Sequence, residues 1–250
     1  MSDPETLNNK VALVTGAARR IGAVIARTLH SHGADVAIHY RGSADEAGAL
    51  VEEFNAARAD SAAAFAADLT DVAAIEQLAA QVTGWRNRLD VLVNNASSFY
   101  PTPAGTITEA QWNDLVGTNL KAPLFLSQAA LPALRAAGGV IVNIVDVHST
   151  HPLRDHPVYG PAKAGLAMLT RSLAKDLAPD VRVNGVSPGA ILWPENDMPE
   201  DTRAAILKQV PLARPGDPAD IAGAVLFLVR DATYVTGQVI AIDGGRSIGW

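Results

Sequence analysis

Tyr159 and Lys163 are the residues of this sequence whose types and spacing best suit proton chemistry. They lie in a stretch with a helical pattern that runs to about Leu177, and a spacing of four puts both side chains on one helical face. A tyrosine with its ordinary pKa of about 10 exchanges protons poorly near neutral pH, but a nearby ammonium group stabilises the phenolate and lowers that pKa. The pair therefore predicts a proton donor beside a group that is being reduced.

The elements that must position this pair are seven short apolar runs, which alternate with longer amphipathic stretches. This pattern is typical of a parallel sheet with crossover helices. The predicted strands are Val11–Thr15, Asp35–Tyr40, Ala62–Ala66, Val91–Asn94, Val140–Val145, Val181–Val186 and Val239–Ile242. We expect a single α/β domain over residues 1–250, built on one doubly wound, Rossmann-type sheet with helices on both faces. Ligands of such sheets bind outside the carboxyl ends of the strands.

Three helix starts carry capping signals. Ser43–Glu46 and Thr108–Gln111 have the residue types of capping boxes, and Asp217 precedes a proline at the first position of a helix expected over Ile221–Val229.

The first strand runs into a glycine-containing loop and then a helix. Gly16 permits a tight turn, Gly22 permits close packing of the helix, and the helix N-terminus offers free N–H groups to a pyrophosphate. An ordinary strand-to-helix turn has the same residue types. The position near the N-terminus, between a strand and a helix, favours dinucleotide binding.

The end of the second strand indicates which dinucleotide. An enzyme that selects NAD usually has an acidic residue here, but no carboxylate follows His39 and Tyr40 until Asp45, already inside a predicted helix. Arg41 and Ser43 instead offer a cation and a hydroxyl that suit a 2′-phosphate. Alternatively, Arg41 is merely solvated and Ser43 merely caps its helix. We expect NADPH as the cofactor.

The composition restricts the class of function. Of 250 residues, 48% are hydrophobic and 18% are charged. The net charge of −6 comes without a cluster of Lys and Arg, so we expect no nucleic-acid partner.

There is no cysteine, which excludes disulfides and thiolate chemistry. No apolar run approaches the ~20 residues that span a bilayer, and the N-terminus is polar and acidic, so we expect a cytoplasmic protein without a membrane partner. His148, His151 and His156 lack a carboxylate scaffold, so we expect no metal site.

These motifs together resemble the short-chain dehydrogenase/reductase family over about residues 9–246. The first loop is similar to the family's Thr-Gly-x-x-x-Gly-x-Gly motif, except that Arg20 replaces the middle glycine and adds a fixed positive charge near the phosphates or the substrate. The resemblance implies a homotetramer and a substrate lid at about residues 190–213, in which Trp193 borders the pocket. The role of the terminal Trp250 stays open, although an exposed tryptophan suggests a partner surface.

The resemblance also assigns residues to the cofactor. The expected contacts are Gly16, Arg20, Ile21, Gly22, His39, Tyr40, Arg41, Ser43, Asp68, Leu69, Asn95, Ala96, Tyr159, Lys163, Pro188 and Gly189. For Asp68, the start of the next helix is an equally simple explanation. Asn119 matches the asparagine of a proton relay in the family, although an asparagine in a helix can also satisfy local backbone groups.

Within that family, the run Asn94–Pro103 and the residue Asp146 resemble the pteridine reductases. In that subgroup the residues that match Ser97 and Phe99 contact the substrate, and the phenylalanine sandwiches the pterin against the nicotinamide. Alternatively, Phe99 and Tyr100 anchor their loop to the core. The resemblance implies Asp146, Tyr159, Lys163 and Asn119 as catalytic residues, and Arg20, Ser97, Phe99, Asp146, Tyr159 and Trp193 as substrate-binding residues.

Asp146 stands where most of the family carries a serine that binds a substrate carbonyl. A carboxylate repels a carbonyl oxygen that gains negative charge, whereas it accepts hydrogen bonds from the ring N–H groups of a pterin. If Asp146 only caps a turn, Ser149 is the substitute. We expect NADPH-dependent reduction of pteridines. The alternatives are a carbonyl reductase that acts on ketone or keto-acyl substrates, and a cofactor-binding sensor without turnover, which would not need the tyrosine.

Overall fold

The computed structural model describes residues 6–193 and 199–248, and within them seven strands form one parallel sheet in the order β3-β2-β1-β4-β5-β6-β7. The strands are β1 (Val11–Val14), β2 (Asp35–Tyr40), β3 (Ala62–Ala66), β4 (Val91–Asn94), β5 (Val140–Ile144), β6 (Arg182–Pro188) and β7 (Val239–Ile242). The strand order reverses between β1 and β4, and ligands of open α/β sheets bind at this switch point.

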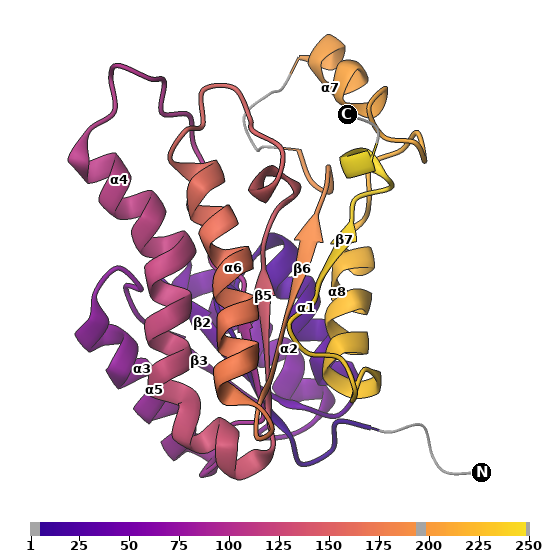
Figure 1. Ribbon diagram of the computed structural model, residues 1–250. Coiled ribbons are helices and arrows are strands. Elements are labelled where there is room, and N and C mark those ends of the chain that lie inside the picture. The colour runs from indigo at the N-terminus through magenta and orange to yellow at the C-terminus, as the bar shows by residue number, and fades with distance from the viewer. Residues whose placement is uncertain (1–5, 194–198, 249–250) are drawn as a thin grey trace.

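Helices cover both faces of the sheet (Figure 1). They are α1 (Arg20–Ser31), α2 (Ala44–Ala57), α3 (Val72–Arg86), α4 (Glu109–Val116), α5 (Ala122–Ala137), α6 (Tyr159–Leu177), α7 (Glu200–Leu207) and α8 (Pro218–Leu226). Helices α1, α2 and α8 share one hydrophobic core with the sheet, and α3, α5 and α6 share the other. The doubly wound α/β fold expected from the sequence is therefore confirmed.

The central strands are apolar on consecutive residues because both of their faces are covered. Every residue of β1, β4 and β5 is buried. The predicted strand bounds agree with the structure to within two residues at each end. The largest difference is at β6, which continues to Pro188 because it pairs with β7 up to that residue.

Two of the three predicted helix caps are present. Thr108 and Gln111 form a capping box at α4, and Asp217 caps α8 in a box closed by Asp220. The expected box at Ser43 is wrong. Ser43 does precede α2, but its side chain makes no capping hydrogen bond. Helix α8 is also shorter than predicted, because its last turn widens into the π-helical turn η3 (Phe227–Asp231).

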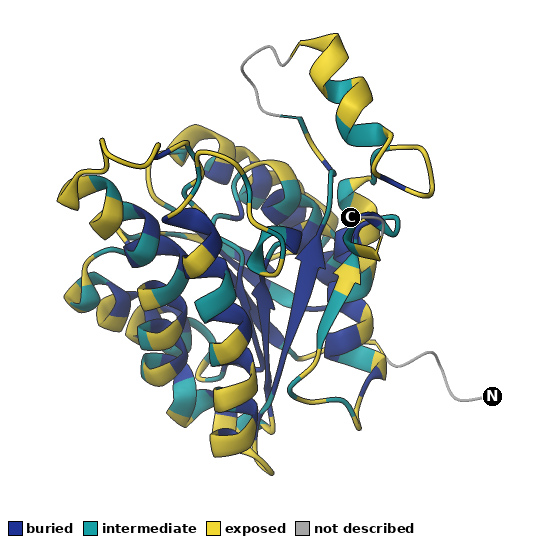
Figure 2. Ribbon diagram, turned by 45° about the horizontal axis from the view of Figure 1, so that its top comes forward, coloured by how far each residue is buried: buried dark blue, intermediate teal, exposed yellow. Residues whose placement is uncertain are grey.

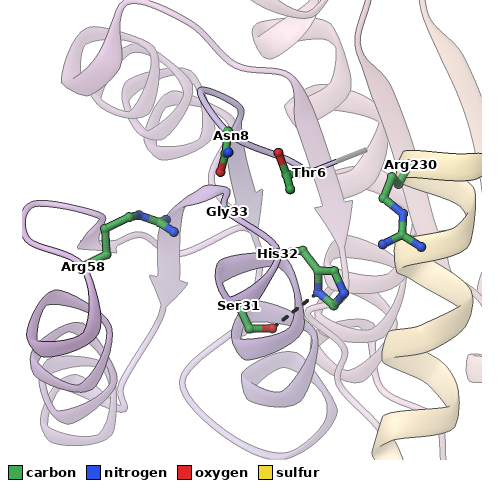
Figure 3. A pocket seen from close by; sticks show the side chains of 7 residues that line it. All are labelled: Thr6, Asn8, Ser31, His32, Gly33, Arg58 and Arg230. Atoms are coloured by element: carbon green, nitrogen blue, oxygen red, sulfur yellow. Dashed lines mark hydrogen bonds between the residues drawn. The ribbon is translucent and has the colours of Figure 1, made fainter. Parts of the chain in front are cut away.

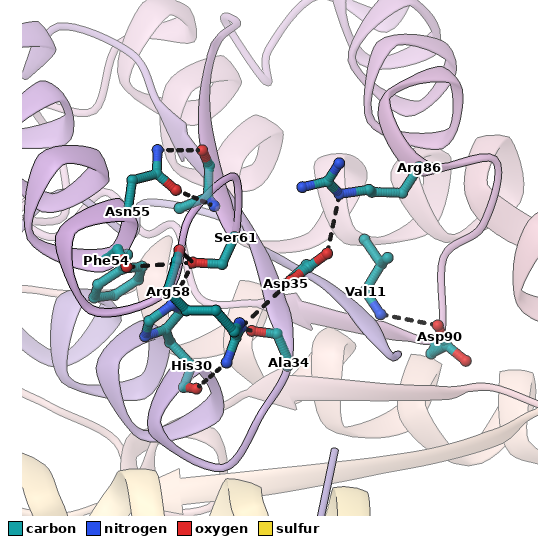
Figure 4. Close-up of polar contacts among 11 residues, drawn as sticks. Val11, His30, Ala34, Asp35, Phe54, Asn55, Arg58, Ser61, Arg86 and Asp90 are labelled. Atoms are coloured by element: carbon teal, nitrogen blue, oxygen red, sulfur yellow. Dashed lines mark hydrogen bonds and ion pairs between the residues drawn. The ribbon is translucent and has the colours of Figure 1, made fainter. Parts of the chain in front are cut away.

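A cluster of polar contacts joins the elements at the amino edge of the sheet (Figure 4). Arg58, after α2, donates to the carbonyl oxygens of His30 and Ala34 and pairs with Asp35. Asp90, before β4, accepts from the backbone N–H of Val11 at 2.9 Å. These contacts fix the amino ends of the strands and leave the carboxyl edge for the site.

The carboxyl edge carries the irregular segments. The 3-10 turn η2 (Val147–Ser149) follows β5, and the π-helical turn η1 (Gly117–Lys121) joins α4 to α5. Helix α7 stands above this edge and has no buried residue (Figures 1 and 2). None of the helices in the described ranges combines the length and apolar character needed to traverse a lipid bilayer.

Candidate active site

The loop after β1 is held in shape by the end of β4. Gly16 has a φ of +61°, in the left-handed region that glycine adopts without strain. A Cβ at Gly22 would lie 2.2 Å from the carbonyl oxygen of Gly16 and 2.6 Å from Nδ2 of Asn95, so no side chain fits there. Asn95 donates this Nδ2 to the carbonyl oxygens of Thr15 (2.8 Å) and Gly16 (3.2 Å). Asn95 is thus a clamp on the loop.

His39, the second clamp, has its ring inside the protein. The N–H of Gly16 donates to Nδ1 (3.1 Å), so Nε2 carries the proton and faces the carbonyl oxygen of Ala67 at 3.1 Å. Burial lowers the pKa of the imidazole to about 4, which keeps the ring neutral. We expected His39 to contact the cofactor. Both ring nitrogens are bonded within the protein, so the ring holds the loop in position, and the contact with the cofactor stays a prediction.

Helix α1 opens toward this loop. Arg19, the residue before the helix, makes no capping bond with its side chain. An uncapped helix start, followed here by Ile21 and Gly22, suits an anionic group such as a pyrophosphate. Arg20 has a φ of +54°, so it retains the left-handed backbone for which glycine is the usual residue. Its guanidinium donates to the carbonyl oxygen of Trp193 at 3.2 Å, which brings the loop and the start of the predicted lid together.

The end of β2 presents Arg41 to solvent beside α4. The guanidinium lies 3.8 Å from Oδ1 of Asp114, and the two side chains are 62% and 32% exposed. An exposed pair at this distance binds weakly, so Arg41 is available to an anion. Tyr40 is half-buried, and the hydroxyl of Ser43 is not used as a helix cap.

Asp68 and Leu69 follow β3, with Asp68 exposed and Leu69 buried. Oδ1 of Asp68 accepts from the N–H (2.9 Å) and the hydroxyl (2.8 Å) of Thr70, and these bonds lower the pKa of the carboxyl. The alternative that Asp68 begins the next helix is wrong, because Asp71 caps α3 by accepting from the N–H of Ala73.

Tyr159 and Asp146 are in direct contact. Tyr159 begins α6, Asp146 follows β5, and the phenol donates to Oδ2 of Asp146 at 2.8 Å. The other oxygen of Asp146 accepts from the N–H of His148 at 2.8 Å, which caps η2. The two roles considered for Asp146, chemistry and capping, therefore use separate oxygens.

The pKa of Tyr159 differs from our expectation. It lies well above its usual 10, first because the phenol is buried and then because the phenolate would face the Asp146 carboxylate. The charge of Lys163 does not outweigh these two effects in the structure. Its Nζ donates to the carbonyl oxygen of Ile144 at 2.9 Å and lies 5.8 Å from the centre of the Tyr159 ring. Burial lowers the pKa of Lys163 itself to about 8.

Ser97 and Asn119 form a second polar group beside the tyrosine. The hydroxyl of Ser97 donates to Oδ1 of Asn119 at 2.7 Å, and a hydrogen bond from Ser97 favours the phenolate of Tyr159, against the effect of Asp146. Asn119 lies fully buried in the π-helical turn η1 and donates to the carbonyl oxygens of Ser98 and Leu115, both at 2.9 Å. Asn119 is thus bonded to Ser97, which in turn acts on Tyr159. Its amide also satisfies two local backbone carbonyl groups.

Phe99 lies at the mouth of the site. Its ring is 50% exposed and packs edge-on against Tyr159, with 4.8 Å between ring centres. His156 stacks nearly parallel to it, at 4.8 Å and 16°. The alternative that Phe99 anchors its loop in the core does not hold, because half of the ring is in solvent, whereas Tyr100 is the member of the pair that packs against the core.

The end of β6 meets the end of β7 behind this site. Gly189 donates its N–H to the carbonyl oxygen of Ile242, and a Cβ at Gly189 would lie 2.7 Å from Cα of Asp243. Pro188 is buried as the last residue of β6. Trp193 is half-buried, with the guanidinium of Arg203 5.8 Å from its ring centre. Residues 194–198 of the predicted lid and the terminal Trp250 lie outside the described residues.

Sequence reasoning missed three residues of the site. His156 was considered only as a metal ligand, although its place three residues before Tyr159 put it at the start of α6. Asp114 lies in α4, and its contacts with Arg41, Ser98 and Tyr100 reveal it. Arg246, in the 3-10 turn η4 (Arg246–Ile248), is buried, and its charge acts on Asp146. Both of the latter contacts join segments that are distant in sequence, so no local pattern predicts them.

A cavity of about 520 Å³ lies at the opposite edge of the sheet and is lined by Thr6, Asn8, Ser31, His32, Gly33, Arg58 and Arg230 (Figure 3). The two arginines that line this cavity already have partners in the protein. Arg58 donates to backbone carbonyl oxygens, and Arg230 pairs with Asp231 at 2.7 Å. It lies away from the catalytic pair. Over residues 6–193 and 199–248, no group of three or more His, Asp or Glu side chains is arranged to hold a metal ion.

The family model described as enoyl-(acyl carrier protein) reductase matches residues 16–247. That match covers the loop after β1, the Asp146–Tyr159 contact and the segment predicted as a lid. The chain belongs to the short-chain dehydrogenase/reductase family. It is an oxidoreductase of that family, and the expectation drawn from the sequence motifs is confirmed.

Relatives within the short-chain dehydrogenase/reductase family differ in substrate. The chain is 39% identical to pteridine reductase 1 of Leishmania tarentolae, with 95% of this chain and 96% of the relative covered. It is also 39% identical to the 3-oxoacyl-[acyl-carrier-protein] reductase of Staphylococcus aureus, over 94% and 97% of the two chains. Among solved structures, a blue fluorescent protein from a metagenomic library, in complex with NADPH, superposes with a TM-score of 0.91 at 36% identity, over 97% and 99% of the chains.

Proposed function

We propose that this protein reduces a pteridine of the dihydropterin or dihydrofolate type with NADPH. The observation that carries the proposal is the 2.8 Å hydrogen bond from Tyr159 to Asp146, beside the half-exposed ring of Phe99. Hydride addition to a C=N bond requires one proton at the nitrogen. Tyr159 supplies that proton, so a ring C=N becomes HC–NH and the tyrosine is left as a phenolate.

The raised pKa of Tyr159 keeps the proton on the phenol at neutral pH, because burial and Asp146 both disfavour the phenolate. The phenol is then a weak acid, so it gives up its proton only as hydride addition makes the ring nitrogen strongly basic. Lys163, one helical turn away, carries the charge that stabilises the phenolate once the proton has left. The tyrosine then regains a proton from solvent.

Asp146 selects the substrate. A carbonyl oxygen that gains negative charge next to this carboxylate is destabilised, whereas a pterin presents N–H groups that donate to it. The half-exposed ring of Phe99 is a flat group against which a pterin ring can pack, and such aromatic contacts contribute about 0.5–1.5 kcal/mol beyond burial.

The chain fits NADPH in two places. The uncapped start of α1, with Ile21 and Gly22 and the clamped loop at Gly16, suits the pyrophosphate. Arg41 and Ser43 suit the 2′-phosphate, because the guanidinium is exposed and the hydroxyl is not used as a cap. When bound, NADPH supplies the hydride. The NADPH complex of the structural relative supports this choice of cofactor.

A steady-state assay of NADPH consumption tests the proposal. We expect turnover with dihydrobiopterin or dihydrofolate, little with simple ketones, and a much lower kcat/KM with NADH. The variant Tyr159→Phe should lose most of the rate, roughly 100-fold or more. Rapid ketone reduction without any pteridine turnover contradicts the proposed substrate, and equal rates with NADH contradict the role of Arg41.

A keto-acyl reductase is the second candidate, because a 3-oxoacyl-[acyl-carrier-protein] reductase is as similar in sequence as the pteridine reductase. The structure gives Asp146 rather than a serine at the position nearest the phenol, which disfavours that substrate. Adding acetoacetyl-coenzyme A to the same assay separates the two candidates.

We also propose that four copies assemble in the cytoplasm. Trp112 on α4, Leu124 on α5 and Met168 on α6 are exposed large apolar side chains on the layer of helices that covers one face of the sheet (Figure 1). Such side chains mark a contact between chains where they form one continuous patch. Sedimentation equilibrium should give four times the mass of one chain.

A further inference from the structure

The loop that carries Phe99 is held on both sides by one carboxylate. The hydroxyl of Tyr100 donates to Oδ2 of Asp114 at 3.0 Å, and the hydroxyl of Ser98 donates to Oδ1 at 3.3 Å. Ser98 and Tyr100 are the two neighbours of Phe99 in the chain. The position of the Phe99 backbone therefore depends on Asp114, which lies in α4.

The same carboxylate faces the cofactor side of the site. Oδ1 of Asp114 lies 3.8 Å from the guanidinium of Arg41, at the end of β2. The charge of Arg41 also acts on Asp68, at the end of β3. Arg41 is thus attracted by two carboxylates, and a 2′-phosphate would compete with both for it.

We propose that Asp114 is a positioning residue whose single carboxylate interacts both with Arg41, which binds the cofactor, and with the substrate loop around Phe99. This inference rests on the proposed function, because it takes NADPH at Arg41 and a flat substrate at Phe99. Asp114 weakens NADPH binding, because its carboxylate competes with the 2′-phosphate for Arg41 and repels that phosphate. It strengthens substrate binding, since an ionised acceptor holds the hydroxyls of Ser98 and Tyr100 more firmly than a neutral one.

The variant Asp114→Asn separates these two effects, because it removes the charge and keeps an oxygen in place. We expect the Kd for NADPH, measured by cofactor fluorescence, to fall roughly two- to five-fold, the size of effect usual for exposed charge pairs. The Kd for NADH, which has no 2′-phosphate, should not change. The KM for the dihydropteridine should rise roughly three-fold or more while kcat stays within about two-fold. Damage to the fold would instead weaken both sites together.

Two further variants complete the design. Tyr100→Phe keeps every charge and removes one bond to the loop, so it should raise the KM for the pteridine and leave the Kd for NADPH unchanged. Asp180→Asn makes the same chemical change in an exposed Arg–Asp pair far from the site, where Arg135 lies 3.6 Å from Asp180, and should change none of these constants. If Asp114→Asn does not fold, Tyr100→Phe still tests the loop.

An unchanged or higher Kd for NADPH in Asp114→Asn overturns the coupling, and so does an unchanged KM in Tyr100→Phe. Failure of the proposed function is visible separately. In that case the wild-type protein turns over no pteridine, whereas the cofactor measurement needs no substrate and still reports whether Asp114 competes for Arg41.

Discussion

At the scale of single residues, the site depends on which groups face the phenol of Tyr159. A phenol beside a cation ionises more easily, whereas a phenol beside a carboxylate stays protonated. Here Asp146 is hydrogen-bonded to Tyr159, and Lys163 is bonded to a backbone carbonyl instead. The tyrosine therefore keeps its proton until the acceptor becomes basic enough to take it, and the lysine acts on the phenolate that remains.

The pH dependence of reduction should report Lys163. Its pKa is lowered by burial to about 8, so the side chain is charged below that pH and neutral above it. The pKa of Tyr159 is raised, so the phenol keeps its proton over the same range. We predict that kcat falls as pH rises through about 8, and that Lys163→Met has a low kcat without this step. A rate that is constant from pH 6 to 10 would rule out a role for the ammonium charge.

Arg20 combines a strained backbone with a useful charge. A non-glycine residue in the left-handed region costs roughly 1–2 kcal/mol, and glycine costs about 0.5–1 kcal/mol in chain entropy, so Arg20→Gly should leave the free energy of unfolding within ~1 kcal/mol of wild type. The same change removes the guanidinium and its bond to Trp193, so the KM for the pteridine should rise. Chemical denaturation and steady-state kinetics check the two halves. A large gain or loss of stability in Arg20→Gly would contradict the expectation that the backbone costs of arginine and glycine nearly cancel at this position.

At the scale of elements, the two edges of the sheet have separate tasks. The carboxyl edge holds the loops after β1, β4 and β5, and Asn95 and His39 hold the first of these loops from neighbouring strands. The amino edge is closed by polar contacts such as those of Asp90, which is 4% exposed (Figure 4). Substitutions at the amino edge should therefore change stability and leave the chemistry intact.

Asp90→Asn tests this division. Burial raises the pKa of Asp90, but bonds from Arg88, the N–H of Val11 and Lys10 outweigh it, and the pKa lies below its usual value. A carboxyl whose pKa is lower in the folded than in the unfolded state stabilises the fold at pH values above its unfolded-state pKa of about 3.9. This stabilisation is lost as the pH falls through the folded-state pKa. We predict a loss of about 1–3 kcal/mol at pH 7, and a smaller difference from wild type as the pH falls below about 4.

Urea denaturation at pH 7 and at acid pH measures this loss. The control is Glu53→Gln, which breaks an exposed bidentate pair with Arg27 at 2.8 Å and should cost no more than ~1 kcal/mol. Equal losses in the two variants, or a loss in Asp90→Asn that persists in acid, would show that burial of the carboxylate is not what matters.

At the scale of the whole molecule, the fold was predictable because the signals are local. Strands such as Val11–Val14 are apolar runs between turns, and the helix that starts at Tyr159 continues as far as its pattern indicated. The resemblance to the pteridine reductases implied Tyr159 and Asp146 as members of one catalytic set, and the fold brings the two side chains into contact. The inward ring of His39, the stack of His156 on Phe99 and the shared carboxylate of Asp114 were not predictable, because each joins segments whose approach only the folded chain defines.

The central claim is that the carboxylate of Asp146, next to a protonated Tyr159, selects a pteridine over a carbonyl substrate. The most direct test is the ratio of kcat/KM for dihydrobiopterin to kcat/KM for acetoacetyl-coenzyme A, measured with NADPH in the wild-type protein and in Asp146→Ser. We predict a ratio well above one for the wild type and a fall of roughly 100-fold in the variant, since the loss of one charged partner contributes about 1.5–3 kcal/mol to discrimination. A ratio that Asp146→Ser leaves unchanged, or that already favours the keto-acyl substrate in the wild type, would contradict the account.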